Sequence, residues 1–460
     1  MGSKEIPFSR FTPDSRPMDT VLCFDGAWSD GKYKTWRDLF HETALIRAAL
    51  ASSPKAKWLL HAEDYWHFLV AFIALFQCKK EVLLTANITP GNIAEITGSE
   101  AGIISDQAIP GALQIGAILA AGGAPSGEIV HIPFNPVESV FVIFTSGSTG
   151  KPKAIPHRIV EFEVNIGLPQ SWVDAWHERK NIVTVNQHHI YGLIFSIILP
   201  FTLGVPFRRK RIERPEEFEK LDDVPYIIYT SPAFLKRTTE SGVNLSMKEP
   251  YIIVSGGFLL PETAEKTNSL FGFWPIDIYG STEGSGVAWR QSKDGPEWRP
   301  FASLKVSANE AGCLMIHLPI PNVPPIPTGD LVELLPGGRF ILKGRADSIV
   351  KIEEKRISLT EVEERILESG MVDDACVVPF EDRRQYLAAA IVLNSKAKAQ
   401  FDGKEKAEIN KYWTNYLAKY FEGTVIPKKF RYVDILPQDT QGKKPREQIK
   451  ALFSQDSADE

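Results

Sequence analysis

The sequence has little cysteine and no strong excess of either charge. Its four cysteines are far apart and form no CxxC pair, which argues against a disulfide framework or a zinc site. A net charge of −5 gives no reason to expect nucleic acid as the partner. The first ten residues, MGSKEIPFSR, lack the apolar core of a signal peptide. We therefore expect a protein of the reducing cytoplasm that does not bind nucleic acid.

One long uncharged run resembles a membrane span. Residues 190–207 carry no charge and precede the basic run 208–211, as a positive-inside anchor would. Two glycines and two prolines interrupt the run, so we predict a buried helix of two or three turns, a short strand and no transmembrane segment. The basic run is predicted to be a solvated loop, with a targeting or lipid-binding patch as the alternative.

Short apolar runs alternate with amphipathic stretches over the first 280 residues, which is typical of an α/β fold with helices on the faces of parallel or mixed sheets. Helices are predicted at 35–50 and 65–76, and strands at 57–61, 81–84, 140–144, 181–185, 226–230, 251–254 and 275–279. Ligands of such sheets bind beyond the carboxyl ends of the strands. The loops that begin at Thr145, Thr230, Ser255 and Tyr279 are therefore the expected places for chemistry.

The composition changes after about residue 300. Prolines cluster at 319–327 and a hairpin is predicted around 336–338. We expect a large N-terminal domain, 1–346, of mixed α/β sheets with a β-rich subdomain. A small, mobile α+β domain is expected at 347–460, with helices at 360–369 and 404–421, strands at 375–379, 388–393 and 430–436, and a disordered acidic tail.

The most informative segment is TSGSTGKPK at 145–153, directly after an apolar run. Its glycines allow close backbone approach, and its hydroxyl, amide and ammonium groups suit a polyphosphate. It is not a P-loop, because only two residues separate Gly147 from Gly150 and Pro152 follows Lys151. If the chain uses ATP, it binds the phosphates in another way.

Five further motifs follow this loop in order: SGG at 255–257, YGSTE at 279–283, TGD at 328–330, GRAD at 344–347 and QGKKPR at 441–446. Together the six resemble the motif set of the adenylate-forming superfamily, which includes acyl- and aryl-CoA ligases, nonribosomal adenylation domains and luciferase. Within it the chain is similar to small stand-alone aryl- or acyl-acyl-carrier-protein ligases of the aryl-polyene type. The resemblance implies ATP and Mg²⁺ as cofactors.

The resemblance also implies roles for individual residues. The first loop would hold the β- and γ-phosphates, with Lys153 as a mobile cation, Tyr279 would pack against adenine, and Glu283 would bind magnesium. Asp330 would accept the ribose hydroxyls. The expected ATP-binding set is Thr145, Ser146, Gly147, Ser148, Thr149, Gly150, Lys153, Ser255, Gly256, Gly257, Tyr279, Gly280, Ser281, Asp330 and Arg345, and the expected catalytic set is Lys443, Glu283, Thr282 and His189.

Two positions bear on the acid and the acceptor. His189 matches a segment that lines the acyl pocket of the family, and the YGLIFS that follows it lacks the aspartate of amino-acid-activating members. We therefore expect an aryl or acyl acid without an α-amino group, held among Ile190, Tyr191, Phe195, Phe258 and neighbouring apolar side chains. Glu354 stands where most members have a glycine, which puts free CoA in doubt and leaves an acyl carrier protein as the other acceptor.

The implied reaction is the ATP-dependent formation of an acyl-adenylate followed by transfer to a thiol. Asp347 would be the hinge about which the small domain turns between the two steps, and Lys443 would meet the carboxylate and the α-phosphate in the first. The alternatives are a non-catalytic nucleotide-binding protein and an adenylating enzyme with an amine or oxygen acceptor.

Overall fold

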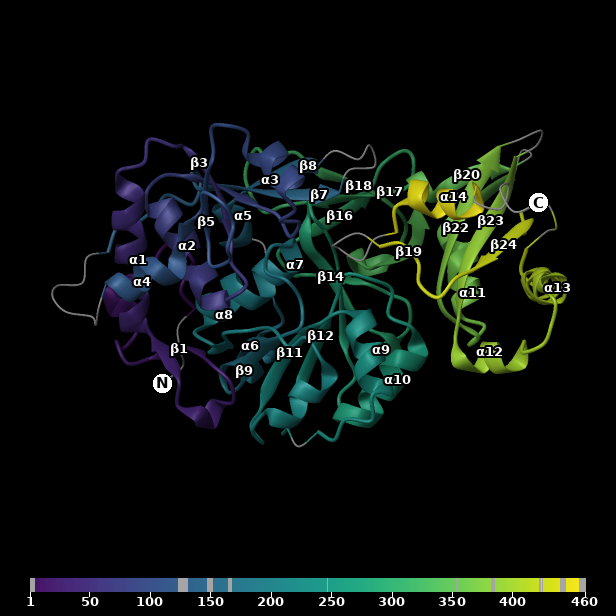
Figure 1. Cartoon of the computed structure of the whole chain (residues 1–460), viewed down its shortest axis with the longest axis horizontal. Helices are drawn as coiled ribbons and strands as arrows, with labels where there is room; N and C mark the ends of the chain where they lie inside the picture. The colour runs from purple at the N-terminus through teal and green to yellow at the C-terminus, as the bar shows by residue number, and fades with distance from the viewer. Residues whose placement is uncertain are drawn as a thin grey trace. The chain divides into compact units, whose positions relative to one another are not determined.

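The chain has a two-domain α/β fold with a large N-terminal and a small C-terminal domain (Figure 1). The computed structural model describes residues 5–122, 131–146, 152–163, 168–245, 247–352, 355–381, 385–421, 423, 425–438 and 444–454, without the side chains of residues 146, 347, 349, 351, 355 and 356. The larger compact unit comprises Met1–Ser307, Met315–Ile326 and Leu335–Phe340, and the smaller one Ala308–Leu314, Pro327–Leu334 and Ile341–Glu460.

A six-stranded sheet of the larger unit has the order β6-β5-β3-β4-β7-β8. Its neighbouring strands are parallel except for the antiparallel pair β7 and β8. The strands are β3 (Lys57–His61), β4 (Glu81–Leu84), β5 (Gly102–Ser105), β6 (Leu113–Gln114), β7 (Val140–Ser146) and β8 (Pro152–Arg158). The strands predicted at 57–61 and 81–84 are confirmed to the residue.

A nine-stranded sheet has the order β15-β14-β13-β12-β11-β9-β10-β1-β2. The strands from β13 to β1 are parallel, and antiparallel strands complete both edges. They are β1 (Val21–Phe24), β2 (Tyr33–Thr35), β9 (Lys180–Val183), β10 (Phe207–Arg208), β11 (Tyr226–Thr230), β12 (Tyr251–Val254), β13 (Ile276–Ser281), β14 (Ser285–Gln291) and β15 (Arg299–Pro300). The carboxyl ends of β11, β12 and β13 therefore lie side by side.

Helix α2 (Tyr65–Gln77) is the centre of the larger core. Asp64 caps it by accepting a 2.9 Å hydrogen bond from the Trp66 amide, and every residue of the helix except His67 is buried. Its partners are β3, β4, helix α1 (Trp36–Ala51) and the segment Leu193–Ile198. A helix that is apolar on all sides needs such surroundings. The other helices of this unit are α3 (Pro90–Thr97), α4 (Ile115–Ala121), α5 (Ile159–Glu163), α6 (Gln170–His177), α9 (Pro232–Glu240) and α10 (Pro261–Phe271).

The uncharged run 190–207 is buried, as predicted, but its helical part is longer than predicted. Helices α7 (Ile190–Gly192) and α8 (Leu199–Leu203) are joined by a π-helical segment, Leu193–Ile198, and β10 follows. Pro200 stands in the first turn of α8, where a proline is tolerated because its missing N–H removes no bond of that helix. Across the described ranges, no helix is long and apolar enough to cross a membrane.

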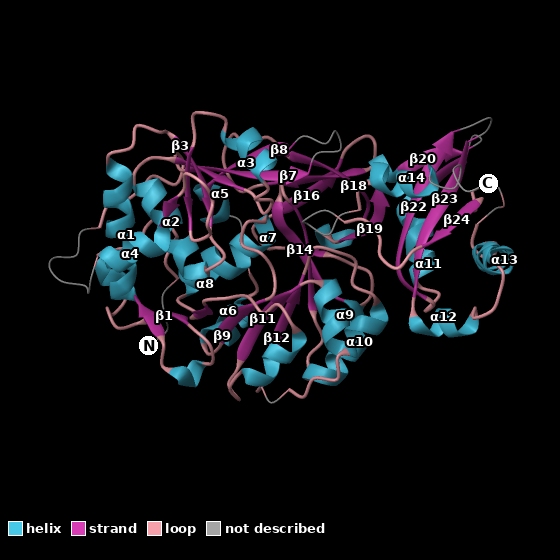
Figure 2. Cartoon of the chain, in the orientation of Figure 1, coloured by secondary structure: helices cyan, strands magenta, loops and turns pink. Residues whose placement is uncertain are grey.

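The smaller unit contains a three-stranded sheet, β22-β23-β24, with helices packed against it (Figure 2). Its strands are β22 (Val372–Glu381), β23 (Gln385–Leu393) and β24 (Lys429–Tyr432), and its helices are α11 (Leu359–Leu367), α12 (Ser395–Gln400), α13 (Lys406–Leu417) and α14 (Arg446–Ser454). A hairpin, β20 (Ile349–Ile352) and β21 (Lys355–Ser358), precedes them. A four-stranded sheet has the order β16 (Lys305–Ala308), β17 (Cys313–His317), β18 (Ile326–Leu334) and β19 (Phe340–Arg345).

The core of the smaller unit depends on Trp413, which is fully buried on α13. We predict that Trp413→Ala destabilises this unit by about 3–5 kcal/mol, because removal of the indole leaves a cavity. Hydrogen-exchange protection of the β23 amides measures the loss. Lys411→Ala, an exposed change on the same helix, should alter protection by less than about 0.5 kcal/mol. Equal protection in both variants would contradict the prediction.

Candidate functional site

The first loop of the expected site leaves β7 and returns in β8. The antiparallel register places Thr145 opposite Lys153, and Thr145 is buried at the strand end. Gly147, Ser148, Thr149 and Gly150 lie outside the described residues, as does the side chain of Ser146. The two strand ends thus hold the loop's first hydroxyl and its terminal cation next to each other.

Lys153 and Glu283 are brought together although 130 residues separate them. The Lys153 Nζ lies 2.7 Å from the Glu283 Oε1, and both side chains are partly exposed. An ion pair of this exposure contributes little to stability, about 0–1 kcal/mol. Its geometry places one cation and one hard oxygen donor at the same point, where a polyphosphate and its metal ion need both.

The YGSTE segment lies at the turn between β13 and β14. A bulge follows Tyr279, and the Ser281 Oγ accepts a 2.9 Å hydrogen bond from the Gly284 amide. A Cβ on Gly280 would lie 2.1 Å from the Ser285 backbone oxygen, so this position requires glycine. The turn directs Thr282 and Glu283 away from the sheet ladder.

The Tyr279 ring belongs to an aromatic cluster. It lies 5.6 Å from the Trp298 ring and 5.8 Å from the Phe340 ring, measured between centroids. The Arg290 guanidinium lies over Trp298 at 4.4 Å from the ring centroid and donates two hydrogen bonds, of 3.0 and 3.1 Å, to the Asp277 Oδ2. A buried ion pair therefore fixes the indole against which Tyr279 rests.

The SGG segment follows β12. The Ser255 amide donates to the Thr230 backbone oxygen at 3.2 Å, and the Ser255 Oγ donates to the Ile278 backbone oxygen at 2.7 Å. Gly256 has a φ of +89°, a conformation that side chains rarely adopt. The hydroxyl of Ser255 thus joins the ends of β12 and β13, and the segment presents mainly backbone to its surroundings.

His189 begins the helical run after β9. Its backbone oxygen accepts from the Leu193 amide at 2.8 Å, and a Cβ on Gly192 would lie 2.0 Å from the Asn186 backbone oxygen. The neighbouring His188 stacks on His61 with centroids 4.1 Å apart, and burial lowers the pKa of both imidazoles. A tightly packed, uncharged support therefore holds the loop of His189.

Of the side chains expected near the acid, Tyr191 and Phe195 are in ring contact, with centroids 5.2 Å apart. The Tyr191 hydroxyl donates to the Ile253 backbone oxygen at 2.9 Å, at the end of β12. Phe195 is fully buried, whereas Phe258 is 45% exposed. The structure brings the first two together and leaves Phe258 at the surface.

Two motifs meet within the smaller unit. The Arg345 Nη1 lies 3.4 Å from the Asp330 Oδ1, and a Cβ on Gly329 would come within 2.8 Å of the Arg345 guanidinium. The Asp330 amide donates to the Thr328 Oγ1 at 3.2 Å, and that hydroxyl donates to the Leu314 backbone oxygen. TGD and GRAD thus form one polar cluster.

Lys443 and Glu354 lie outside the described residues, but the chain is well fixed immediately after Lys443. The Lys444 Nζ pairs with Asp374 and donates to the Ala375 backbone oxygen at 2.8 Å. The Arg446 Nη2 donates to the Ser348 Oγ at 2.8 Å, one residue after the expected hinge at Asp347. The smaller unit therefore fixes both the residue that follows the expected hinge and the segment that follows Lys443.

Comparison with known proteins decides the family. The family model "AMP-binding enzyme" matches residues 12–313, and the model "AMP-binding enzyme C-terminal domain" matches residues 361–443. The chain belongs to the AMP-binding enzyme family. The resemblance to adenylate-forming enzymes drawn from the six motifs is thereby confirmed.

Among curated relatives, this AMP-binding enzyme is 24% identical to a 4-coumarate–CoA ligase of Cereibacter sphaeroides over 308 residues, which cover 66% of the chain and 69% of the relative. Seven further curated relatives are covered over 5–60% of their length. The fold is similar to a benzoate CoA ligase from Burkholderia xenovorans (TM-score 0.74, 18% identity, 93% and 96% of the two chains). It is also similar to an o-succinylbenzoate CoA synthetase from Bacillus subtilis in complex with an acyl-adenylate (0.74, 17%, 94% and 95%).

The sequence predictions missed the support of this AMP-binding enzyme's aromatic cluster. Asp277 was a detectable signal, because it is an acid inside an apolar strand and stands two residues before Tyr279, on the same face. Arg290 and Trp298 carried no comparable signal, since only the pairing of β13 with β14 brings them there.

Burial raises the pKa of Asp277 from 3.8 to about 6, although Arg290 opposes the shift. A raised carboxyl pKa makes ionisation less favourable in the folded state, so this group's contribution to stability falls as pH rises from about 4 to 6. Relative to Asp277→Asn, the wild-type free energy of unfolding should fall by about 2 kcal/mol between pH 4 and pH 7. Chemical denaturation at several pH values measures it.

The control for this prediction is Asp294→Asn, whose side chain is 42% exposed. It should leave the pH dependence of unfolding unchanged. Parallel stability curves for the wild type and Asp277→Asn would show that the buried pair does not titrate in this range.

Proposed function

We propose that the chain joins a carboxylic acid without an α-amino group to a thiol in two steps. In the first, an oxygen of the acid attacks the α-phosphorus of ATP, giving an acyl-adenylate and pyrophosphate. In the second, the thiol sulfur attacks the acyl carbon, giving a thioester and AMP and losing its proton. The proposal rests on family membership together with the pairing of Lys153 with Glu283 of the YGSTE segment.

The nucleotide end is supported by the Lys153–Glu283 contact of 2.7 Å. Lys153 supplies positive charge to the phosphates, and the partly exposed pair can open at small energetic cost. The Tyr279 ring, held by Trp298, offers an apolar face to adenine. Asp330 and Arg345, which pair within the smaller unit, are assigned to the ribose.

The residues also suit magnesium. Mg²⁺ is commonly bound through one or two carboxylates together with substrate phosphates, and the Glu283 carboxylate stands beside the cation assigned to those phosphates. When bound, magnesium would offset the charge that accumulates between acid and nucleotide. Lys443 is proposed to act on the same charge.

The acid end is supported by what surrounds His189. Tyr191 and Phe195 provide aromatic surface, and the stretch from His189 to Ser196 carries no carboxylate that could bind a substrate ammonium. Aryl and fatty acids fit this environment better than amino acids. The thiol is either CoA or the phosphopantetheine arm of an acyl carrier protein.

A panel experiment tests the function. The chain is incubated with ATP, Mg²⁺ and aryl or fatty acids, with CoA or a holo-acyl-carrier protein as acceptor. We expect acid-dependent pyrophosphate exchange and one thioester, identified by mass spectrometry. Absence of acyl-AMP with every acid would favour the nucleotide-binding alternative. Transfer of the acyl group from acyl-AMP to an amine or alcohol, and to neither thiol, would favour an adenylating enzyme with an amine or oxygen acceptor.

Measuring the two half-reactions separately tests the role of Lys443. Lys443→Ala should lower acid-dependent pyrophosphate exchange by about a hundredfold or more, because a charge that stabilises the transition state is lost. Thiol capture of supplied acyl-adenylate should be largely retained. Lys450→Ala, which removes a lysine paired with Glu447 on α14, is the matched control and should retain both. Equal loss of both half-reactions in Lys443→Ala would contradict the assignment.

A further inference from the structure

A second crevice lies at the switch point of the six-stranded sheet. Strands β3 and β5 are parallel neighbours, but the chain leaves β3 toward β4 on one side and β5 toward β6 on the other. In open α/β sheets ligands bind outside the carboxyl ends of strands at such a point. None of the residues assigned to ATP or the acid follows these strands.

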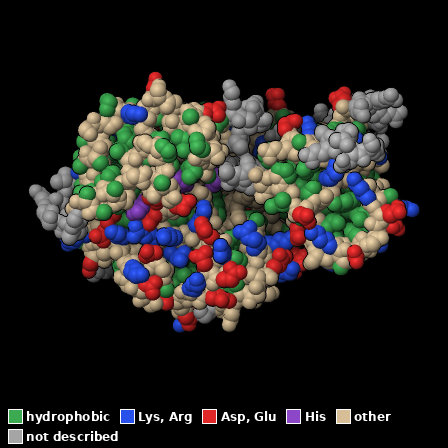
Figure 3. Space-filling model, viewed as in Figure 1, with side chains coloured by type: hydrophobic (Ala, Val, Ile, Leu, Met, Phe, Trp, Pro, Cys, Tyr) green, Lys and Arg blue, Asp and Glu red, His purple; other side chains and the backbone are tan. Residues whose placement is uncertain are grey.

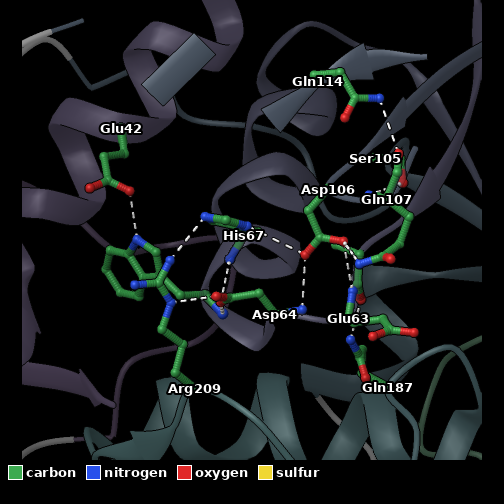
Figure 4. Close-up of polar contacts among 12 residues, drawn as sticks. Glu42, Glu63, Asp64, His67, Ser105, Asp106, Gln107, Gln114, Gln187 and Arg209 are labelled. Carbon is green, nitrogen blue, oxygen red and sulfur yellow. Dashed lines mark hydrogen bonds and ion pairs between the residues drawn. The ribbon is translucent and has the colours of Figure 1, made fainter. Parts of the chain in front are cut away.

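Charged side chains fill this end of the sheet (Figure 4). Asp106, directly after β5, accepts hydrogen bonds of 3.0 Å from the amides of Glu63 and Asp64 and one of 2.9 Å from the Gln107 side chain. These bonds and His67 lower the pKa of Asp106 to about 2 despite its burial. The His67 Nδ1 lies 3.4 Å from the Asp106 Oδ2.

Arg209 reaches the same place from the nine-stranded sheet. Its Nε pairs with Asp64, and its Nη2 donates to the His67 Nε2 at 3.0 Å. A guanidinium only donates, so the His67 Nε2 accepts and its Nδ1 carries the proton. The basic run 208–211 is therefore not simply a solvated loop, because the Arg209 side chain is bonded to Asp64 and His67.

A cavity of about 320 Å³ opens beside His67 and Arg209. Lys34, Asp38, Glu42 and Ala120 also line it, and a second cavity, of about 160 Å³, shares Lys34 and Arg209 with it. The face of the larger unit in Figure 3 carries many lysine and arginine side chains, with acidic ones between them. The first cavity is large enough for a small organic molecule.

The hydrogen-bonding groups of the cavity favour an acceptor. Glu42 accepts from the Trp66 Nε1 at 2.6 Å and pairs with Lys34, and the Asp38 Oδ2 accepts from the amide and hydroxyl of Thr35. Both carboxylates are thus engaged. The bonds described use one of the three N–H groups of Lys34 and two of the five of Arg209, so both cations keep N–H groups for a further acceptor.

We propose that this cavity binds a small anion, through a phosphate or carboxylate group that lies between Lys34 and Arg209. The site is distinct from the proposed catalytic site and goes beyond the proposed reaction. An anion there would add acceptors to two partly used cationic donors without breaking the contacts of Glu42 and Asp64.

Calorimetric titration of the full chain with inorganic phosphate and, separately, with malonate tests the proposal. We expect saturable binding of at least one of them, and the tighter one identifies the group. Ala120→Glu adds a carboxylate to the cavity wall and should weaken that binding by about tenfold or more. Ala117→Glu, on the same short helix but outside the cavity lining, is the matched control and should change it by less than about twofold.

A second variant, Lys34→Gln, removes one cation and should also weaken binding, with circular dichroism verifying the fold. The proposal is overturned if neither anion binds saturably to the wild type, or if Ala120→Glu binds as tightly as the wild type. Acid-dependent pyrophosphate exchange, measured without added phosphate or malonate, should be retained in Ala120→Glu. Failure of the cavity and failure of the proposed function are therefore distinguishable.

Discussion

Burial of α2 on every side is the constraint on which the larger unit depends. Twelve of its thirteen residues are buried, and each large apolar side chain contributes about 1.5–3 kcal/mol when removed from water. Helix α1, strands β3 and β4 and the segment Leu193–Ile198 supply the contacts. The stabilisation from burying these side chains far exceeds the contribution of the Lys153–Glu283 ion pair, which is about 0–1 kcal/mol. Packing, not charge attraction, sets the strand ends of the larger unit, and so the ion pair is able to exchange partners without loosening the fold.

The charges of the candidate site have different physical tasks. The Asp277–Arg290 pair is buried and orients rings, whereas Lys153 and Glu283, which the proposed function assigns to the phosphates and magnesium, are partly exposed. Separation of this kind is useful, because a buried charge holds its place only through its partner and a charge used in chemistry must be accessible. Tyr279 connects the two kinds of residue: its ring rests on the buried cluster, and Thr282 and Glu283 follow it in the turn.

Much of the fold could be predicted from the sequence because the local spacing of apolar residues indicates which segments form helices and strands. The helix expected at 65–76 ends one residue later, and the strand expected at 226–230 has those bounds. Local rules failed where tertiary packing decided. The helical run passes through Pro200 in a buried setting, and the strand expected at 430–436 ends at Tyr432.

In the candidate site, too, local motifs could be predicted from the sequence, whereas contacts between distant segments could not. The order of the motifs identified the family, and Lys153 with Glu283, and Asp330 with Arg345, are indeed neighbours. The supporting residues Arg290, Trp298 and His188 were missed, because a contact between distant segments leaves no pattern in one sequence. The roles of individual residues in ATP binding, and the hinge at Asp347, remain predictions.

The hydrogen bond from Arg446 to Ser348 has a consequence for engineering by domain exchange. It ties the first turn after the expected hinge to the first turn of α14, near the far end of the same unit. A donor segment that begins after Ser348 would separate these partners and leave a guanidinium facing a foreign residue. A junction placed before Ser348 transfers both together, so the natural boundary for recombination lies at or ahead of residue 347.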